Sequence, residues 1–159
     1  MLVPDVDTYV TVTEADSYFD IHYGYEKWAD LDEPTKEQLL RSAVVKLDTS
    51  CTWYGEKCAP DQPLAFPRNY PDETCTTPQG IKDGQCEIAY LILDTGVSLS
   101  GSLENTMKRL KAGGVEMEYF DRVPPADVLL SGIVSSLLGK YGLCGGGGSM
   151  TTVIPVLRS

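Results

Sequence analysis

The chain has 159 residues, a length for one domain or one domain with a tail, which argues against a repeat array or a large two-domain enzyme. Hydrophobic residues make up 42% and charged residues 23%, the proportions of a globular protein with its own core. Acidic residues number 23 against 13 Lys and Arg, and the net charge of −10 disfavours a basic nucleic-acid binder or a protein attracted to anionic lipid.

The first seven residues contain neither a basic nor an apolar run, so we expect no secretory signal peptide. The longest uninterrupted apolar run covers residues 88–93, whereas spanning a bilayer takes about 20 residues. We therefore expect no membrane association.

Residues 8–12 predict a short extended lead into a first helix. The segment Thr13-Glu14-Ala15-Asp16 resembles a capping box with Asp in the last position, so the helix is expected to begin at Thr13. Gly24 offers a stop. The apolar face has i, i+3, i+4, i+7 spacing and contains Ala15, Tyr18, Phe19 and His22. Trp28 is expected in a loop or a short second turn.

A second, longer helix is expected to start at Asp32-Glu33-Pro34, where proline suits the first turn and acids suit the positive end of the helix dipole. Its apolar stripe consists of Leu39, Leu40, Ala43, Val44 and Leu47. Residues 49–78 then contain five prolines and three cysteines, and this composition predicts a long loop held by Trp53 and Phe66.

Thr77-Pro78 indicates another helix start. Its body, residues 81–93, becomes apolar on nearly every face toward its end, which predicts that this end lies in the core or in a subunit contact. Residues 106–120 read as a hairpin that turns at Gly113-Gly114. This turn opposes Ala112 to Val115, Lys111 to Glu116, Leu110 to Met117 and Arg109 to Glu118, so that one face is apolar and the other carries two opposite-charge pairs.

Pro124-Pro125-Ala126-Asp127 predicts the start of a final helix, whose apolar positions are Val128, Leu129, Ile133, Leu137 and Tyr141. Gly142 is expected to end it. We therefore divide the chain into a helical domain at 1–144, a glycine linker at 145–149 and an apolar arm at 150–159. The predicted fold class is mainly α: a small helical bundle with one β-hairpin and an extended C-terminal arm.

The arm is too β-branched and apolar for a solvated tail. It is either a terminal strand of its own domain or a segment that docks on a partner's sheet edge or groove. We favour docking, with Thr152, Val153, Ile154, Val156 and Leu157 as the partner-binding residues. Pro155 lacks an amide donor and would interrupt strand pairing.

Cysteine and histidine chemistry gives no enzymatic signature. Cys51, Cys58, Cys75, Cys86 and Cys144 form no C-x-x-C pair, so free thiols without metal are expected, with a Cys58–Cys75 bridge as the alternative. The single histidine, His22, is expected to pack beside Tyr18 rather than to activate a cysteine across the fold. Since nucleophile-elbow, phosphate-loop and zinc-protease motifs are also missing, we expect no enzyme and no cofactor.

Several segments in order resemble the tailed-phage head-tail adaptor (head completion, or connector) family, some members of which are labelled DnaT-like single-stranded DNA-binding proteins. Phe66 stands where many relatives have Trp, and the insert at 69–79 is longer than usual. The resemblance covers about residues 8–95 and is carried by residues 9–19, Trp28, 40–48, 53–57 and 62–68.

This resemblance implies a mostly helical virion protein of the phage neck, at the head-tail junction, which resides in the host cytoplasm during viral assembly. Its copies would form a homo-oligomeric ring, dodecameric in such connectors, which binds the portal protein and a downstream tail or stopper protein. The ring would extend the DNA channel of the portal, and genomic DNA would pass through it without specific binding. Residues 62–68 carry no recognisable catalytic chemistry. From their prolines and Phe66 we interpret them as a loop clamp over the helices, with Arg68 paired to an acid or carbonyl.

The competing function is a single-stranded DNA-binding module. Bases could stack on aromatic residues near the N-terminus, namely Tyr9, Tyr18, Tyr23, Tyr25 and Trp28. A groove for the phosphates needs clustered Lys and Arg, however, and residues 1–60 contain five basic residues against 12 acidic ones. A zinc or redox protein is a third alternative, which the cysteine spacing disfavours.

Overall fold

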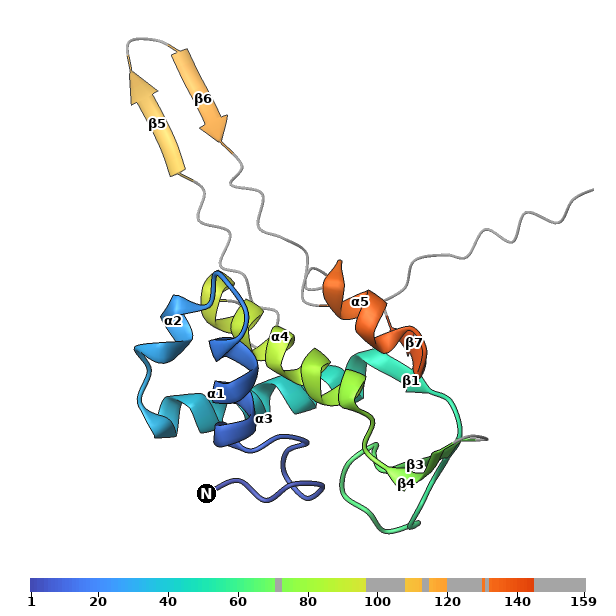
Figure 1. The fold of residues 1–159 in the computed structure, drawn as a ribbon. Helices are drawn as coiled ribbons and strands as arrows, with labels where there is room; N and C mark the ends of the chain where they lie inside the picture. The colour runs from blue at the N-terminus through green and yellow to red at the C-terminus, as the bar shows by residue number, and fades with distance from the viewer. Residues whose placement is uncertain (71–72, 97–107, 113–114, 120–129, 131, 145–159) are drawn as a thin grey trace, which may run out of the picture.

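The computed structural model describes residues 1–70, 73–96, 108–112, 115–119, 130 and 132–144. Figure 1 shows a helical body with two small sheets at one side and a third, a hairpin, drawn apart from them. The helices are α1 (Val12–Asp20), α2 (Glu26–Ala29), α3 (Glu33–Ser50), α4 (Gln79–Thr95) and α5 (Ile133–Leu138). The strands are β1 (Cys51–Trp53), β2 (Glu56–Lys57), β3 (Arg68–Tyr70), β4 (Glu73–Thr76), β5 (Lys108–Ala112), β6 (Val115–Tyr119) and β7 (Gly142–Cys144).

The described strands form three antiparallel sheets, so the chain is a mixed α/β protein. Their orders are β2-β3-β4, β1-β7 and β5-β6. The prediction of a mainly α helical bundle with one hairpin was wrong. Strands β1 to β4 have two to four residues each, which is too few to show an alternating apolar pattern. Their sequence therefore looks like a loop, and the strands form only through pairing in the tertiary structure.

The core lies where α3 crosses α4, with α1 and α2 packed against them. The predicted stripe of α3 is confirmed, since Leu40, Ala43, Val44 and Leu47 are all buried and Leu39 packs against them. In α4 the buried section runs from Ile81 to Ala89, whereas Leu91, Ile92 and Leu93 are half-buried. The buried part of α4 is therefore its first half and centre, not the apolar end that the sequence indicated. No helix in the described part of the chain is long and apolar enough to cross a membrane.

Two helix starts follow from hydrogen bonds to exposed backbone N–H groups. The Thr11 hydroxyl accepts from the Glu14 N–H, and the Glu14 carboxylate accepts from the Thr11 N–H, so the capping box begins two residues before the predicted Thr13. Glu, rather than Asp16, occupies its last position. Asp32 caps α3 as predicted and accepts from the Thr35 N–H, with Pro34 in the first turn.

The hairpin prediction is confirmed in its register. β5 pairs with β6 so that Ala112 faces Val115 and Leu110 faces Met117, and the two opposite-charge pairs fall at Lys111–Glu116 and Arg109–Glu118. The predicted turn at Gly113-Gly114 lies outside the described residues.

The end of the chain differs from its prediction. α5 has six residues and buries Val134 and Leu138, whereas Ile133 is exposed and Tyr141 follows the helix. Gly142 does not end the helix, which stops at Leu138: it starts β7 and lies so close to β1 that a Cβ there would stand 2.7 Å from the Thr52 carbonyl oxygen. Outside the described residues lie the predicted helix start at 124–127, the linker at 145–149 and the arm with Thr152, Val153, Ile154, Val156 and Leu157, which all stay predictions.

Four of the five cysteines form disulfides, and the prediction of five free thiols was wrong. Cys51 bonds to Cys144 across β1 and β7, and Cys58 bonds to Cys75, the pairing that was the alternative. Spacing in the sequence missed the first bridge because its partners are 93 residues apart and meet only through strand pairing. Cys86 is free and buried in α4.

Candidate nucleic-acid and partner interface

The aromatic residues proposed for base stacking occupy very different environments. Tyr9 and Trp28 are buried, with exposed fractions of 0% and 2%, and Tyr18 and Tyr25 are partly buried. Only Tyr23 among the five is fully open, at 98%. Tyr18, Tyr25 and Trp28 gather around Phe19, but as buried or partly buried rings, so they do not form an open stacking platform for nucleic acid.

Tyr9 is at the centre of a buried polar network. Its hydroxyl donates to Asp48 Oδ1 (2.7 Å) and accepts from the Phe66 N–H (3.2 Å), while Asp48 Oδ2 accepts from the Ala65 N–H (2.9 Å). Burial raises the pKa of Asp48 and outweighs these hydrogen bonds, which favour the carboxylate. Burial and the neighbouring Asp48 also raise the pKa of Tyr9 far above its usual value. The network ties residues 62–68 to α3.

The interpretation of residues 62–68 as a clamp agrees with their contacts. Phe66 is fully buried and packs edge-on against Tyr9 and Trp53. The Gln62 amide donates to three carbonyls of the same loop, and the Arg68 guanidinium donates to the Tyr54, Gly55 and Ala65 carbonyls. Arg68 thus pairs with carbonyls, as predicted.

Tyr18 and Tyr25 meet at a carboxylate that the sequence analysis did not single out. Both hydroxyls donate to Oε1 of Glu87, at 2.6 and 2.7 Å, and Glu87 itself is 4% exposed. Burial, followed by the bond to Glu87, raises the pKa of each tyrosine, so both stay neutral donors. The signal in the sequence was a Gln and a Glu, Gln85 and Glu87, inside an otherwise apolar stretch of α4.

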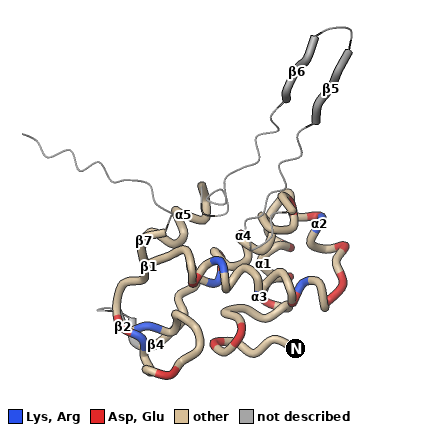
Figure 2. Tube along the Cα trace, turned by 180° about the vertical axis from the view of Figure 1, so that it is seen from behind, with Lys and Arg blue, Asp and Glu red and all other residues tan. Residues whose placement is uncertain are grey.

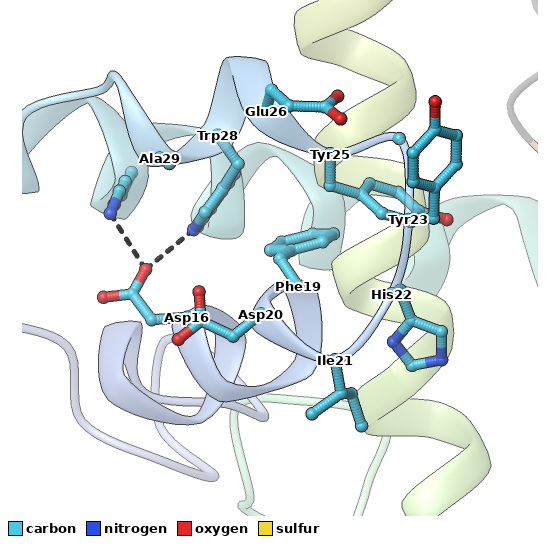
Figure 3. Close-up of a pocket in the computed structure, with 12 residues that line it drawn as sticks. Asp16, Phe19, Asp20, Ile21, His22, Tyr23, Tyr25, Glu26, Trp28 and Ala29 are labelled. Atoms are coloured by element: carbon cyan, nitrogen blue, oxygen red, sulfur yellow. Dashed lines mark hydrogen bonds and ion pairs between the residues drawn. The ribbon is translucent and has the colours of Figure 1, made fainter.

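Trp28 is held by an acid as well. Its indole N–H donates to Asp16 Oδ1 (2.7 Å), and the same oxygen receives Lys36 Nζ (2.9 Å), which lies 5.6 Å from the centre of the Trp28 ring. Figure 3 shows both bonds converging on Asp16. The ring and the nearest lysine are therefore already partnered.

Beside this cluster lies a hollow of about 540 Å³, which we call the acidic hollow. The loop between α1 and α2 forms one wall, with His22 and Tyr23 at its edge. Carboxylates next to aromatic rings favour a cation, such as a Lys or Arg side chain, and disfavour phosphate. Its other lining residues include three aromatics, three acids and one base: Phe19, Tyr25, Trp28, Asp16, Asp20, Glu26 and Lys36.

A second hollow of about 580 Å³, the apolar hollow, lies between α1, α4 and α5. It shares Ile21 and His22 with the acidic hollow, so the two meet at the loop after α1. Ile21 is 80% exposed and Ile133 is 55% exposed, which leaves large aliphatic side chains open at this place. Its other lining residues include Val10, Tyr18, Cys86 and Leu137 and the polar residues Glu14, Gln79, Lys82 and Asp83.

Four basic side chains of the described body are paired with acids. Ion pairs join Lys27 to Asp94, Lys36 to Asp16, Arg41 to Asp7 and Lys82 to Glu14. Figure 2 shows the basic and acidic positions interspersed along the trace. Lys27, Lys36, Arg41 and Lys82 are therefore already engaged by carboxylates and are poorly suited to follow a nucleic-acid backbone.

His22 is exposed and does not belong to a helical core face, contrary to the prediction. It packs on the Tyr18 ring with 4.4 Å between ring centres, and Nδ1 lies 2.6 Å from the Tyr18 carbonyl.

Burial raises the pKa of the Cys86 thiol far above its usual value, which disfavours a reactive thiolate. Among the described residues no group of three or more His, Cys, Asp or Glu is placed to hold a metal ion.

Comparison with known protein families gives a match over nearly the whole chain. A family model described as "Putative DnaT-like ssDNA binding protein" matches residues 1–158. Neither a curated protein nor a solved structure matches significantly. Because the family model spans nearly the whole chain, this protein belongs to the DnaT-like ssDNA binding protein family.

Proposed function

We propose that this chain is a non-enzymatic head-tail adaptor of a tailed phage, a subunit of a ring below the portal. The observation that carries the proposal is that four of the five aromatic residues considered for stacking are buried or partly buried, and that Lys36 and Lys82 pair with acids. Large aliphatic side chains such as Ile21 and Ile133 are exposed on this acidic chain. Such a surface suits contacts between proteins. We infer the specific assembly, a ring below the portal, from the resemblance of residues 8–95, in order, to head-tail adaptors.

In this role the chain has four contacts: the portal protein, neighbouring subunits of a dodecameric ring, a tail or stopper protein, and the genomic DNA that crosses the lumen. The net charge of −10 suits the last of these, because an acidic lumen lets DNA slide without sticking. The protein acts in the virion neck and is assembled in the host cytoplasm.

Single-stranded DNA binding is the second candidate, and the family description speaks for it rather than for the adaptor. One structural feature is compatible with it. Tyr23 is 98% exposed on a loop and could stack on one base. Its surroundings do not support a phosphate track, since Asp20 and Glu26 line the adjacent hollow.

Two measurements on the full chain separate the candidates. Purified protein is mixed with portal complexes and imaged for an added ring, and its affinity for a fluorescent oligonucleotide is followed against salt. The adaptor proposal expects ring addition and only weak DNA binding at moderate salt, because a charge of −10 opposes counterion release. Submicromolar DNA affinity with a steep salt dependence, reduced by Tyr23→Ala, would favour the second candidate. Portal complexes that gain no density would overturn the first.

A further inference from the structure

The two hollows meet at a ridge with unusual exposure. Ile21, His22 and Tyr23 follow α1, and Ile21 and Tyr23 are 80% and 98% exposed although both are large and apolar. On one side of this ridge lies the apolar hollow and on the other side the acidic hollow. A ligand that crosses the ridge therefore meets aliphatic side chains first and carboxylates next.

One segment of the chain has this order of chemistry. Residues 153–157 contain Val153, Ile154, Val156 and Leu157, and the next residue, Arg158, is the single charged side chain of the arm. Aliphatic side chains match the apolar hollow, and a guanidinium matches carboxylates beside aromatic rings. Both hollows lie within the size range of ligand pockets, about 300–1,000 Å³.

We propose that the ridge and its two hollows receive the arm at 150–159 of a second copy of this chain, with Arg158 directed to Asp20 and Glu26. The proposal deepens the adaptor function and rests on it for the choice of partner. A contact between an arm and a different surface on the next copy is heterologous, and such contacts close into rings when the rotation allows. The hollows would then form the joint between neighbours of the ring.

A binding experiment without portal or DNA tests this joint. The receptor is the full chain with Val153→Asp and Ile154→Asp, so that its own arm cannot compete, and the probe is a fluorescent peptide of residues 149–159 followed by anisotropy. We expect saturable binding. Adding Ile21→Asp to the receptor should weaken it at least about tenfold, since an aliphatic side chain that the bound peptide would bury is replaced by a charged one. Because Ile21 is 80% exposed, the substitution leaves the fold intact, which circular dichroism checks.

Val45→Asp is the matched control, because Val45 is 49% exposed on α3 and lines neither hollow. It should leave peptide affinity unchanged. A peptide with Arg158→Glu should bind about two- to fivefold more weakly, as for an exposed ion pair, and Glu26→Lys in the receptor should restore part of the loss. Equal binding to the Ile21→Asp receptor, or no binding to any receptor, overturns the proposal.

The wild-type chain decides between a neighbour's arm and its own. At concentrations where sedimentation shows a monomer, the hollows must be open, and the peptide must bind as it binds the receptor with the substituted arm. A monomer that refuses the peptide would show that the arm folds back on its own chain. Peptide binding together with failed ring addition to portal would instead overturn the adaptor function and keep the joint between copies.

Discussion

Residues 8–50 and 79–95 contain most of the large buried side chains, whereas residues 51–76 contribute only Ala65 and Phe66 to the buried core among those described. The first region, which we call the helical region, is held by the crossing of α3 and α4 and by buried hydrogen bonds. The second, the stapled region, comprises residues 51–76 and 139–144 and contains both disulfides. Where short strands bury little apolar surface, covalent bonds replace packing.

The largest expected effect lies in the stapled region. Cys51→Ser with Cys144→Ser opens a loop closed over 93 residues, and the chain-entropy model gives up to about 4–5 kcal/mol for loops near this length. Cys58→Ser with Cys75→Ser opens a loop of 17 and should cost less, about 3 kcal/mol. Denaturant unfolding of each pair measures both. If the shorter loop costs more, loop length does not govern this region.

Reductant provides the control for that comparison. Dithiothreitol should lower the midpoint of the wild-type chain and of each double variant that keeps one bridge. It should leave the variant without either bridge unchanged, since Cys86 is free. A further shift in that variant would show that the disulfides do not account for the effect.

In the helical region the most sensitive polar residue is Gln85. It is fully buried, accepts from the Tyr9 N–H at 3.0 Å and donates to Thr8 Oγ1 and the Leu40 carbonyl. Gln85→Leu keeps the side-chain size but leaves the Tyr9 N–H, the Thr8 hydroxyl and the Leu40 carbonyl without this hydrogen-bond partner. The free energy of unfolding should therefore fall by about 2–3 kcal/mol. Gln79→Leu, at an exposed position of the same helix, should change it by less than about 0.5 kcal/mol. Equal effects at both positions would contradict the role of the buried network.

Two glycines of α4 allow α5 and the turn that follows it to pack closely on this helix. A Cβ at Gly80 would stand 2.8 Å from the Tyr141 ring and 3.1 Å from the Leu137 carbonyl oxygen, whereas at Gly84 it would meet only the Leu138 side chain. Gly80→Ala should therefore destabilise by about 1–2 kcal/mol through overpacking against backbone. Gly84→Ala should cost less, because a flexible side chain can move. Urea unfolding compares them, and a costlier Gly84→Ala would reverse this ranking.

The smallest effect is the pH response of the α1 cap. Although burial alone would raise the pKa of Glu14, bonds from the Thr11 N–H and hydroxyl and from Lys82 lower it below its ordinary 4.5. A lowered carboxyl pKa stabilises the fold above the unfolded pKa, and this contribution disappears as pH falls through the folded pKa. Glu14→Gln should thus flatten the loss of stability below pH 4.5 by less than about 1 kcal/mol, because the side chain is exposed. An unchanged acid slope in thermal melts would contradict this.

Features that depend on near neighbours could be predicted from the sequence. The α3 stripe, the Asp32 cap and the β5–β6 register all depend on residues a few positions apart, where helical or strand periodicity and turn chemistry decide the outcome. The cap of α1 was displaced by two residues because Thr11 and Thr13 both offer a hydroxyl and both have an acid three residues on. The two candidates differ in that acid, which is Glu14 for Thr11 and Asp16 for Thr13, and Glu is the usual residue of a capping box.

The candidate site was harder to predict for a physical reason. Aromatic residues at the N-terminus could be listed from the sequence, but their burial was decided by partners 62 to 76 positions away, such as Glu87 for Tyr25 and Gln85 for Tyr9. The ridge of Ile21, His22 and Tyr23 could not be recognised from the sequence, because Ile21 and Tyr23 look like ordinary apolar residues at a helix end.

The sequence by itself determined the acidic surface, the long helices and the hairpin register, since charge counts and short-range periodicity need no knowledge of distant contacts. Only the tertiary structure decided the mixed α/β class, the Cys51–Cys144 bridge and the two hollows. Each of these joins residues from distant parts of the chain, and such contacts form only after the helices have packed and the loop entropy has been overcome.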